Sequence, residues 1–180
     1  MRKTVYKLFW LWDFEKEEKW LNEMAAKGLS LINVGFCRYD FIETNPGEYI
    51  IRLEMLDNFP NNPESQKYIQ FIEDTGAEHI GTLFRWTYFR KKTEDSPFDL
   101  YNDIDSRIKH LKRIIWIPVL FGFINLFNAI NMTKQFIQYR YNSYIVLMVL
   151  CWIISMFMLY GFIRIFIKKH SLKKERFFHE

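Results

Sequence analysis

Two long apolar stretches in the last third of the chain limit its possible folds more than any other feature. They cover residues 114–132 and 142–163, and neither holds a charged side chain. A helix needs about 20 apolar residues to cross the hydrocarbon core of a bilayer, where backbone groups must be bonded within the segment. The sequence therefore predicts two transmembrane helices joined by a short outer loop at residues 133–141. Their length and lack of charge favour this interpretation over two buried helices of a soluble helical protein.

Basic side chains lie on the outer flank of each stretch and are scarce between the two. The connecting loop holds only Lys134 and Arg140. Loops rich in Lys and Arg stay in the cytoplasm. The pattern thus predicts a multi-pass protein of the plasma membrane with both termini in the cytoplasm and a basic cytoplasmic tail at residues 164–180. The flanking residues are Arg107, Lys109, Lys112 and Arg113 on one side and Arg164, Lys168, Lys169, Lys173, Lys174 and Arg176 on the other.

The formal charge of +4 averages over two unlike parts of the chain. Residues 1–104 hold 13 basic and 18 acidic side chains, a net of −5, whereas residues 105–180 hold 12 basic and 3 acidic, a net of +9. We expect the basic flanks to contact anionic lipid and expect no nucleic-acid partner, because the N-terminal part is acidic. Cys37 and Cys151 are the only cysteines, so no disulfide framework is predicted.

Residues 1–95 alternate between strand and helix patterns and are predicted to form one cytoplasmic α+β domain. Residues 29–43 are interpreted as a single strand, bent near Gly35 where the alternation of apolar side chains changes phase. The order strand, helix, strand, strand, helix, strand, with one further strand left open, predicts a ferredoxin-like βαββαβ fold. The expected elements are a strand over 3–12, a helix between Asp13 and Gly28, strands over 29–43 and 49–55, a helix between Asn62 and Gly76, and strands over 78–83 and 85–91.

Residues 96–113 are predicted to form an amphipathic juxtamembrane helix. Ser96 to Asp99 has the form of a capping box, with Asp in the place usually held by Glu, and apolar side chains then recur at helical spacing. Two interpretations stay open: a helix that joins the domain rigidly to the membrane, and a tether that packs under the sheet.

The sequence contains no grouping that predicts catalysis, a bound cofactor or a metal centre. Glycine-rich phosphate loops, nucleophile elbows and zinc motifs are absent, and none of the four histidines has a second ligand at metal spacing. The adjacent carboxylates Glu17 and Glu18 diverge on a helix and are interpreted as solvated surface. We therefore expect a protein that is not an enzyme.

Aromatic side chains are the unusual feature of the first 95 residues. On a small sheet about half of the strand residues face the helices, so the others must face water or a partner. One interpretation is a core enlarged by aromatic residues. The other is a sheet face that binds an apolar ligand, a second copy of the chain or the bilayer surface. The residues predicted for this candidate surface are Trp10, Trp12, Phe84, Trp86 and Tyr88.

Small and amide side chains gather on one side of the first apolar stretch. An Asn that faced lipid would be costly, so this side is predicted to contact another helix. That helix is either the second stretch, which is the favoured interpretation, or a helix of another copy. The residues concerned are Gly122, Asn125, Asn128 and Ala129.

Four sequence segments resemble a known family. They are WDFEKEEKWLNEMAAKGL at 12–29, PGEYIIRLE at 46–54, WTYFRK at 86–91 and SPFDLYNDIDSRIKHLKRI at 96–114. They are similar to the signature of the bacterial family DUF2812, a family of unknown function. The resemblance implies a membrane-anchored protein of Gram-positive bacterial type, often encoded beside a PadR-like regulator. It brings no established activity and no catalytic residues.

These observations lead to one main hypothesis. The chain is predicted to be a non-enzymatic two-pass membrane protein whose cytoplasmic domain binds a small ligand, a protein partner or a second copy. The resemblance implies an accessory role in bacterial signalling or envelope response. The alternative is a component of a small transport or efflux assembly, which is disfavoured because no acidic or basic side chain lies within the two apolar stretches.

Overall fold

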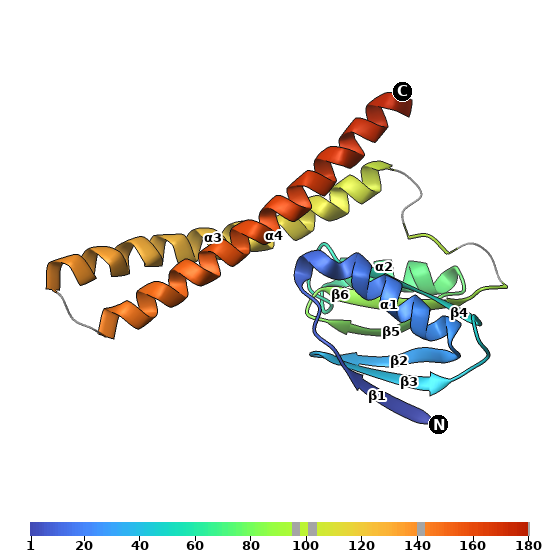
Figure 1. The fold of residues 1–180 in the computed structure, drawn as a ribbon. Helices are drawn as coiled ribbons and strands as arrows, with labels where there is room; N and C mark the ends of the chain where they lie inside the picture. Colours follow the sequence, from blue (N-terminus) through green and yellow to red (C-terminus); the bar gives the residue numbers. More distant parts are fainter. Residues whose placement is uncertain (95–97, 101–103, 140–142, 180) are drawn as a thin grey trace. The chain divides into compact units, whose positions relative to one another are not determined.

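The structure is a computed structural model that describes residues 1–94, 98–100, 104–139 and 143–179 (Figure 1). The chain divides into two compact units, Met1–Asn102 and Asp103–Glu180. The first unit contains all the strands of the described residues, and the second consists of two long helices.

The N-terminal unit is built from two successive copies of one motif, strand–helix–strand–strand. Each copy forms a three-stranded antiparallel sheet whose last strand lies in the middle, in the orders β1-β3-β2 and β4-β6-β5. The first copy comprises β1 (Arg2–Tyr6), the 3₁₀ helix η1 (Leu11–Asp13), α1 (Phe14–Ala26), β2 (Leu29–Gly35) and β3 (Arg38–Glu43). The second comprises β4 (Tyr49–Met55), α2 (Pro63–Asp74), β5 (Glu78–Leu83) and β6 (Trp86–Lys92).

This arrangement confirms the predicted α+β class, whereas the ferredoxin-like order is not confirmed. The difference arises at residues 29–43, which form two strands rather than one bent strand. The chain reverses at Phe36 and Cys37, and Cys37 adopts a left-handed backbone with φ of 54°. The change of phase near Gly35 therefore marks a hairpin turn. The strand predicted over 3–12 also ends early, at Tyr6, because the chain leaves the sheet before η1.

Other elements lie where the sequence predicts them. Helix α1 ends before Gly28, whose φ of +78° and close approach to the carbonyl oxygen of Thr44 leave no room for a Cβ atom. Helix α2 begins after Asn62, whose side-chain oxygen accepts a hydrogen bond from the backbone N–H of Glu64 at 2.9 Å. Strand β4 covers the predicted residues 49–55.

Helix α1 supplies the core that joins the two sheets. Its side chains Leu21 and Ala25 are buried in one cluster with residues from both copies of the motif. A second cluster, around Phe89, packs α2 against the same β6 strand that gives Tyr88 to the first cluster. Because neighbouring strand residues point to opposite faces, β6 is covered by α1 on one face and by α2 on the other. The partners of Leu21 and Ala25 are Leu31, Tyr39, Phe41, Ile51, Leu53 and Tyr88.

Helix α1 also satisfies the free edge of β4. The side chain of Asn22 donates to the carbonyl of Ile51 and accepts from its N–H, both at 2.9 Å. One turn earlier, Glu18 accepts from the N–H of Leu53 at 3.0 Å. Four residues of helix rise about 6 Å and two residues of strand about 6.8 Å, so the two spacings match. An edge that would otherwise offer unpaired backbone groups is thereby closed.

Replacing Asn22 by Ala is expected to lower the free energy of unfolding by about 2 kcal/mol, because the N–H of Ile51 loses its partner and its carbonyl keeps only the weaker hydrogen bond from Arg52, at 3.3 Å. Urea unfolding measures the loss, and amide hydrogen exchange should accelerate at Ile51. Gln70→Ala is the matched control, since within the described part of the chain its amide bonds only Asp74, on the exposed side of α2. An Asn22→Ala protein as stable as the control would contradict this account of the edge.

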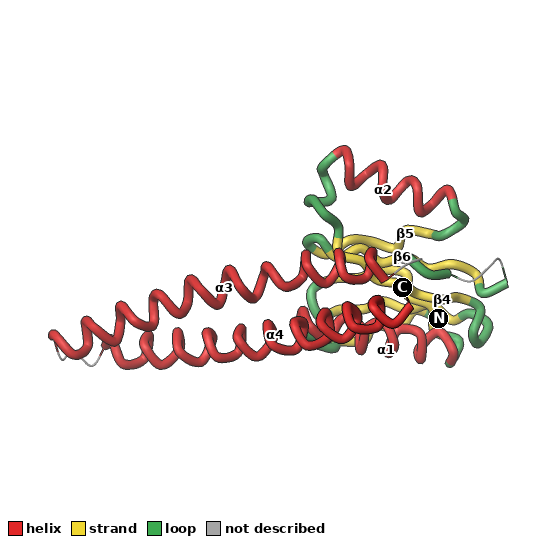
Figure 2. The backbone as a smooth tube through the Cα atoms, turned by 90° about the horizontal axis from the view of Figure 1, so that it is seen from above, coloured by secondary structure: helices red, strands yellow, loops and turns green. Residues whose placement is uncertain are grey.

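The C-terminal unit consists of α3 (Ile104–Tyr139) and α4 (Ser143–His179), which pack side by side as an antiparallel pair (Figure 2). Both helices extend beyond the predicted membrane spans at 114–132 and 142–163. Of the amphipathic helix predicted over 96–113, residues 98–100 are not helical and the part from Ile104 onward belongs to α3. The predicted capping box at 96–99 lies partly outside the described residues. Residues 133–139 of the predicted outer loop continue α3, and the predicted tail continues α4.

Both helices are long and apolar enough to cross a membrane. Few of their described side chains are buried within the chain, and large apolar ones point outward, such as Phe123, which is 71% exposed. Such a surface is unfavourable in water and favourable in lipid. At one end of the pair Arg176 forms an ion pair with Asp105 at 2.8 Å.

Candidate functional site

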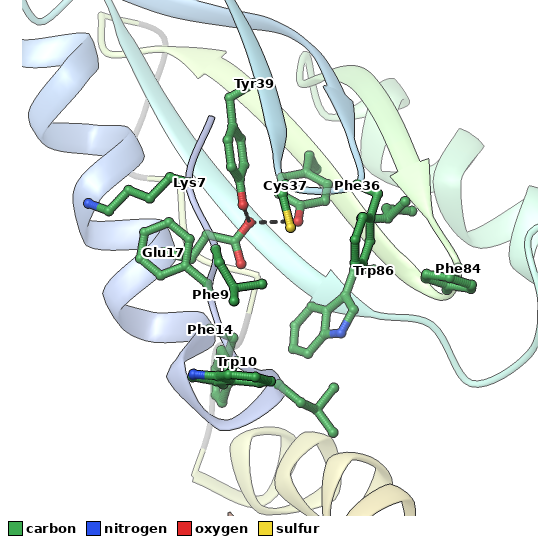
Figure 3. Close-up of a pocket in the computed structure, with 14 residues that line it drawn as sticks. Lys7, Phe9, Trp10, Phe14, Glu17, Phe36, Cys37, Tyr39, Phe84 and Trp86 are labelled. Atoms are coloured by element: carbon green, nitrogen blue, oxygen red, sulfur yellow. Dashed lines mark hydrogen bonds between the residues drawn. The ribbon is translucent and has the colours of Figure 1, made fainter. Parts of the chain in front are cut away.

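A pocket lies where the two copies of the motif meet in the N-terminal unit (Figure 3). Its volume is about 230 Å³. One wall comes from the segment between β1 and η1 and from the start of α1. The opposite walls come from the β2–β3 and β5–β6 hairpins. The lining residues are Lys7, Leu8, Phe9, Trp10, Leu11, Phe14, Glu17, Phe36, Cys37, Tyr39, Leu83, Phe84, Trp86 and Tyr88.

The two hairpin turns bring exposed aromatic rings to the mouth of this pocket. Phe36 is 75% exposed and Phe84 is 72% exposed. Phe84 has a φ of 56°, so each turn contains one non-glycine residue in the left-handed region, the other being Cys37. These are the only two such residues in the described part of the chain. Left-handed backbone costs an ordinary residue about 1–2 kcal/mol. Strain of this kind tends to gather at functional sites.

Glu17 is the only acidic residue of the pocket lining, and it is buried, with 8% of its surface exposed. Its atom Oε1 accepts hydrogen bonds from the hydroxyls of Tyr39 and Tyr88, each at 2.7 Å. Tyr39 belongs to β3 and Tyr88 to β6, so one carboxylate oxygen links the central strands of the two sheets. Among the described residues, Oε2 receives no hydrogen bond and no basic side chain pairs with Glu17.

Burial dominates the electrostatics of this group. Loss of water raises the pKa of Glu17, and the hydrogen bonds from Tyr88 and Tyr39 offset only part of this rise. Burial, followed by the nearby charge of Glu17, raises the pKa of both tyrosines far above the usual value of 10, so they stay protonated donors. The basic lining residue, Lys7, instead places its Nζ over the rings of Phe9 and Trp20, at 4.9 and 4.5 Å from their centroids.

The interpretation of Glu17 and Glu18 as solvated surface is therefore wrong. Glu18 is half-buried beside β4, where it also approaches Arg52 at 3.5 Å. The sequence holds a signal for Glu17. Phe14 and Leu21 mark the apolar side of α1, and Glu17 lies three residues after the first and four before the second, on the same side. A carboxylate on the buried face of a helix indicates a polar site within a core.

The structure brings four of the five predicted surface aromatics to this pocket. They do not share a sheet face, because Trp10 lies before η1 and Phe84 lies in a turn. Trp86 packs on Phe14 at 5.4 Å between ring centroids, and Tyr88 is buried. Trp12 does not line the pocket. It is buried and stacks on Trp10 with 5.9 Å between ring centroids.

The small and amide residues of α3 divide between two environments. Gly122 lies against α4, since a Cβ atom there would come within 3.2 Å of the Cβ of Met158, and Ala129 is fully buried. Asn125 is half-buried and donates to the carbonyl of Phe121 in its own helix at 2.9 Å, and Asn128 is exposed. The two helices thus approach each other through the small residues.

The sequence profile of a family described as a protein of unknown function, DUF2812, matches residues 13–122. This range covers more than half of the 180 residues, including the whole of α1, the second copy of the motif and the first part of α3. The chain belongs to the DUF2812 family. No curated protein and no solved structure matches it. Glu17 and most of the pocket lining lie within the matched range.

Replacing Glu17 by Gln is expected to stabilise the protein at neutral pH and to do so much less in acid. The folded-state pKa of Glu17 lies above the usual 4.5, so the native state holds the proton more tightly than the unfolded state does. The protonated group contributes to the free energy of unfolding. This contribution is complete below pH 4.5 and is lost as the pH rises through the folded-state pKa. Between the unfolded-state and the folded-state pKa, the increase in the free energy of unfolding that Gln gives relative to Glu grows by about 1.4 kcal/mol per pH unit.

Urea unfolding at pH 4 and pH 8, followed by tryptophan emission, measures this gain. Glu23→Gln removes an exposed carboxylate from the same helix and should change little at either pH. An equal effect of Glu17→Gln at both pH values would show that the folded-state pKa is not raised.

Proposed function

We propose that this DUF2812 protein is a non-enzymatic, membrane-anchored binding protein whose N-terminal unit takes up a small organic ligand. The observation that carries the proposal is the open aromatic pocket between the two copies of the motif. Ligand sites are typically apolar cavities with a few converging polar groups, placed where two structural parts meet. A volume of about 230 Å³ favours a ligand smaller than a typical drug.

A ligand in this pocket would touch both copies of the motif, because the two hairpin turns and the start of α1 surround it. Its binding would therefore favour one relative placement of the two sheets over others, which is how a ligand can be sensed. This supports a role as an accessory of a bacterial signalling or envelope-response system, linked to a PadR-like regulator as the family resemblance implies.

The second part of the proposal concerns the membrane. We infer that α3 and α4 cross the cell membrane and that both termini are cytoplasmic. The basic residues at the outer flanks of the two apolar stretches support this orientation.

Reporter fusions test the orientation. A green fluorescent protein fused after residue 180 is expected to fluoresce, and alkaline phosphatase fused after residue 137 is expected to be active, because it would lie outside. Each position is tested with both reporters. Active phosphatase at residue 180 would refute the proposed topology.

Cys37 provides a direct test of ligand binding, because it lines the pocket. In full-length Cys151→Ser protein in phosphatidylcholine nanodiscs, 2-methylquinoline is expected to slow alkylation of Cys37 by N-ethylmaleimide, with saturation. Removing the two rings at the pocket mouth, in Phe36→Ala/Phe84→Ala, should weaken this protection about three- to tenfold, in line with the energy of aromatic contacts.

Phe71→Ala is the matched control, because Phe71 is an exposed phenylalanine on α2 that does not line this pocket. It should leave protection unchanged. Absence of saturable protection in the unsubstituted pocket would refute the binding function.

A further inference from the structure

We infer that the pocket is selective for a small organic cation and that Glu17 is the counter-ion of this ligand. The inference rests on the proposed binding function and adds the chemical class of the ligand. It starts from the incomplete pairing of Glu17 within the chain.

Another buried carboxylate, that of Asp40, is neutralised by side chains of the same chain. Asp40, on β3, is fully buried and receives hydrogen bonds on both oxygens. Its donors are Thr4, Asn33, Arg2 and Arg38, two of them guanidinium groups, and together they hold its pKa far below the usual value. Asp40 is therefore a closed structural ion site.

Glu17 has fewer partners than Asp40. It receives two neutral donors on Oε1 and none from the described residues on Oε2, although it is almost as well buried. A buried charge is costly unless a partner of opposite charge compensates it. Because Glu17 lines the cavity, the missing partner can come from a ligand that enters the cavity.

The pocket walls suit an organic cation rather than a metal ion. Aromatic faces attract cations, and organic ammonium groups are recognised by such rings. The ammonium group of Lys7 already lies on Phe9 and Trp20 at one side of the pocket. Figure 3 shows its side chain directed away from Glu17, so it does not act as counter-ion. A metal ion would need several polar ligands, and no group of three or more His, Cys, Asp or Glu that could hold one occurs among the described residues.

Charge selectivity separates this inference from the general binding function. The probes are 1-methylquinolinium and 2-methylquinoline, which have the same ring system and the same number of heavy atoms and differ by one positive charge at pH 8. Both are titrated against the alkylation of Cys37 in full-length Cys151→Ser protein, in nanodiscs of zwitterionic phosphatidylcholine, so that the cation is not drawn to anionic lipid.

The cation is expected to bind at least about tenfold more tightly than the neutral probe, as a desolvated pairing with carboxylate and rings would give. Glu17→Gln should remove most of this preference, because only the attraction of the cation to the rings remains. It should retain the affinity for 2-methylquinoline, because Gln keeps an oxygen acceptor for the two tyrosines. Glu23→Gln, which removes the same charge from an exposed position, should retain the preference.

Equal binding of the two probes, or a preference for the cation that is undiminished in Glu17→Gln, would overturn the inference while the binding function stands. Protection by neither probe would overturn both.

Discussion

Helix α1 is the constraint on which the rest of the N-terminal unit depends, because one helix serves two sheets. Its apolar side packs on strands from both copies of the motif, and a neighbouring row, Glu18 and Asn22, bonds the edge of β4. Packing against a helix is one of the ways in which a small sheet becomes stable. The junction of the two sheets is therefore fixed by α1, and the pocket lies at that junction.

The same helix explains how a carboxylate can be placed inside an aromatic pocket. Glu17 lies in the first turn of α1, where the positive end of the helix dipole favours a negative side chain. The two tyrosine hydroxyls supply further partial positive charge to one of its oxygens. These contributions do not outweigh the loss of water, since the pKa of Glu17 is still raised. The site thus tolerates a charge without neutralising it, unlike the site around Asp40.

Local signals predict much of this fold. Gly28 and Asn62 mark helix ends through backbone geometry and a side-chain cap, and the alternation over residues 49–55 predicts β4. The hairpin at Phe36 and Cys37 escapes prediction because neither residue is typical of tight turns with left-handed backbone. The duplication of the motif is not predicted either, because the two copies have the same order of elements but no evident similarity in sequence. The first strand is predicted too long because its pattern includes aromatic residues that lie beyond the end of β1 and line the pocket.

The candidate site is harder to predict, because it depends on contacts between distant residues. Tyr88 donates to a carboxylate 71 positions earlier in the sequence, and no local pattern contains that pair. Four of the five aromatic residues chosen for the candidate surface line the pocket, but they do not share a sheet face. The position of Glu17 between Phe14 and Leu21 carries the information that was missed. The rule that neighbouring carboxylates on a helix lie at the surface fails here, because α1 is covered on two sides: Glu17 is buried in the pocket and Glu18 is half-buried against β4.

The two proposed properties of the protein support each other chemically. The cytoplasmic leaflet carries a negative surface potential, which concentrates cations within about a Debye length of the lipid. A binding unit tethered there by two transmembrane helices would meet organic cations at higher concentration than it would in the bulk cytoplasm. A pocket with one uncompensated carboxylate and aromatic walls would then need only moderate affinity to respond. Membrane attachment and the incomplete pairing of Glu17 are thus two parts of one explanation.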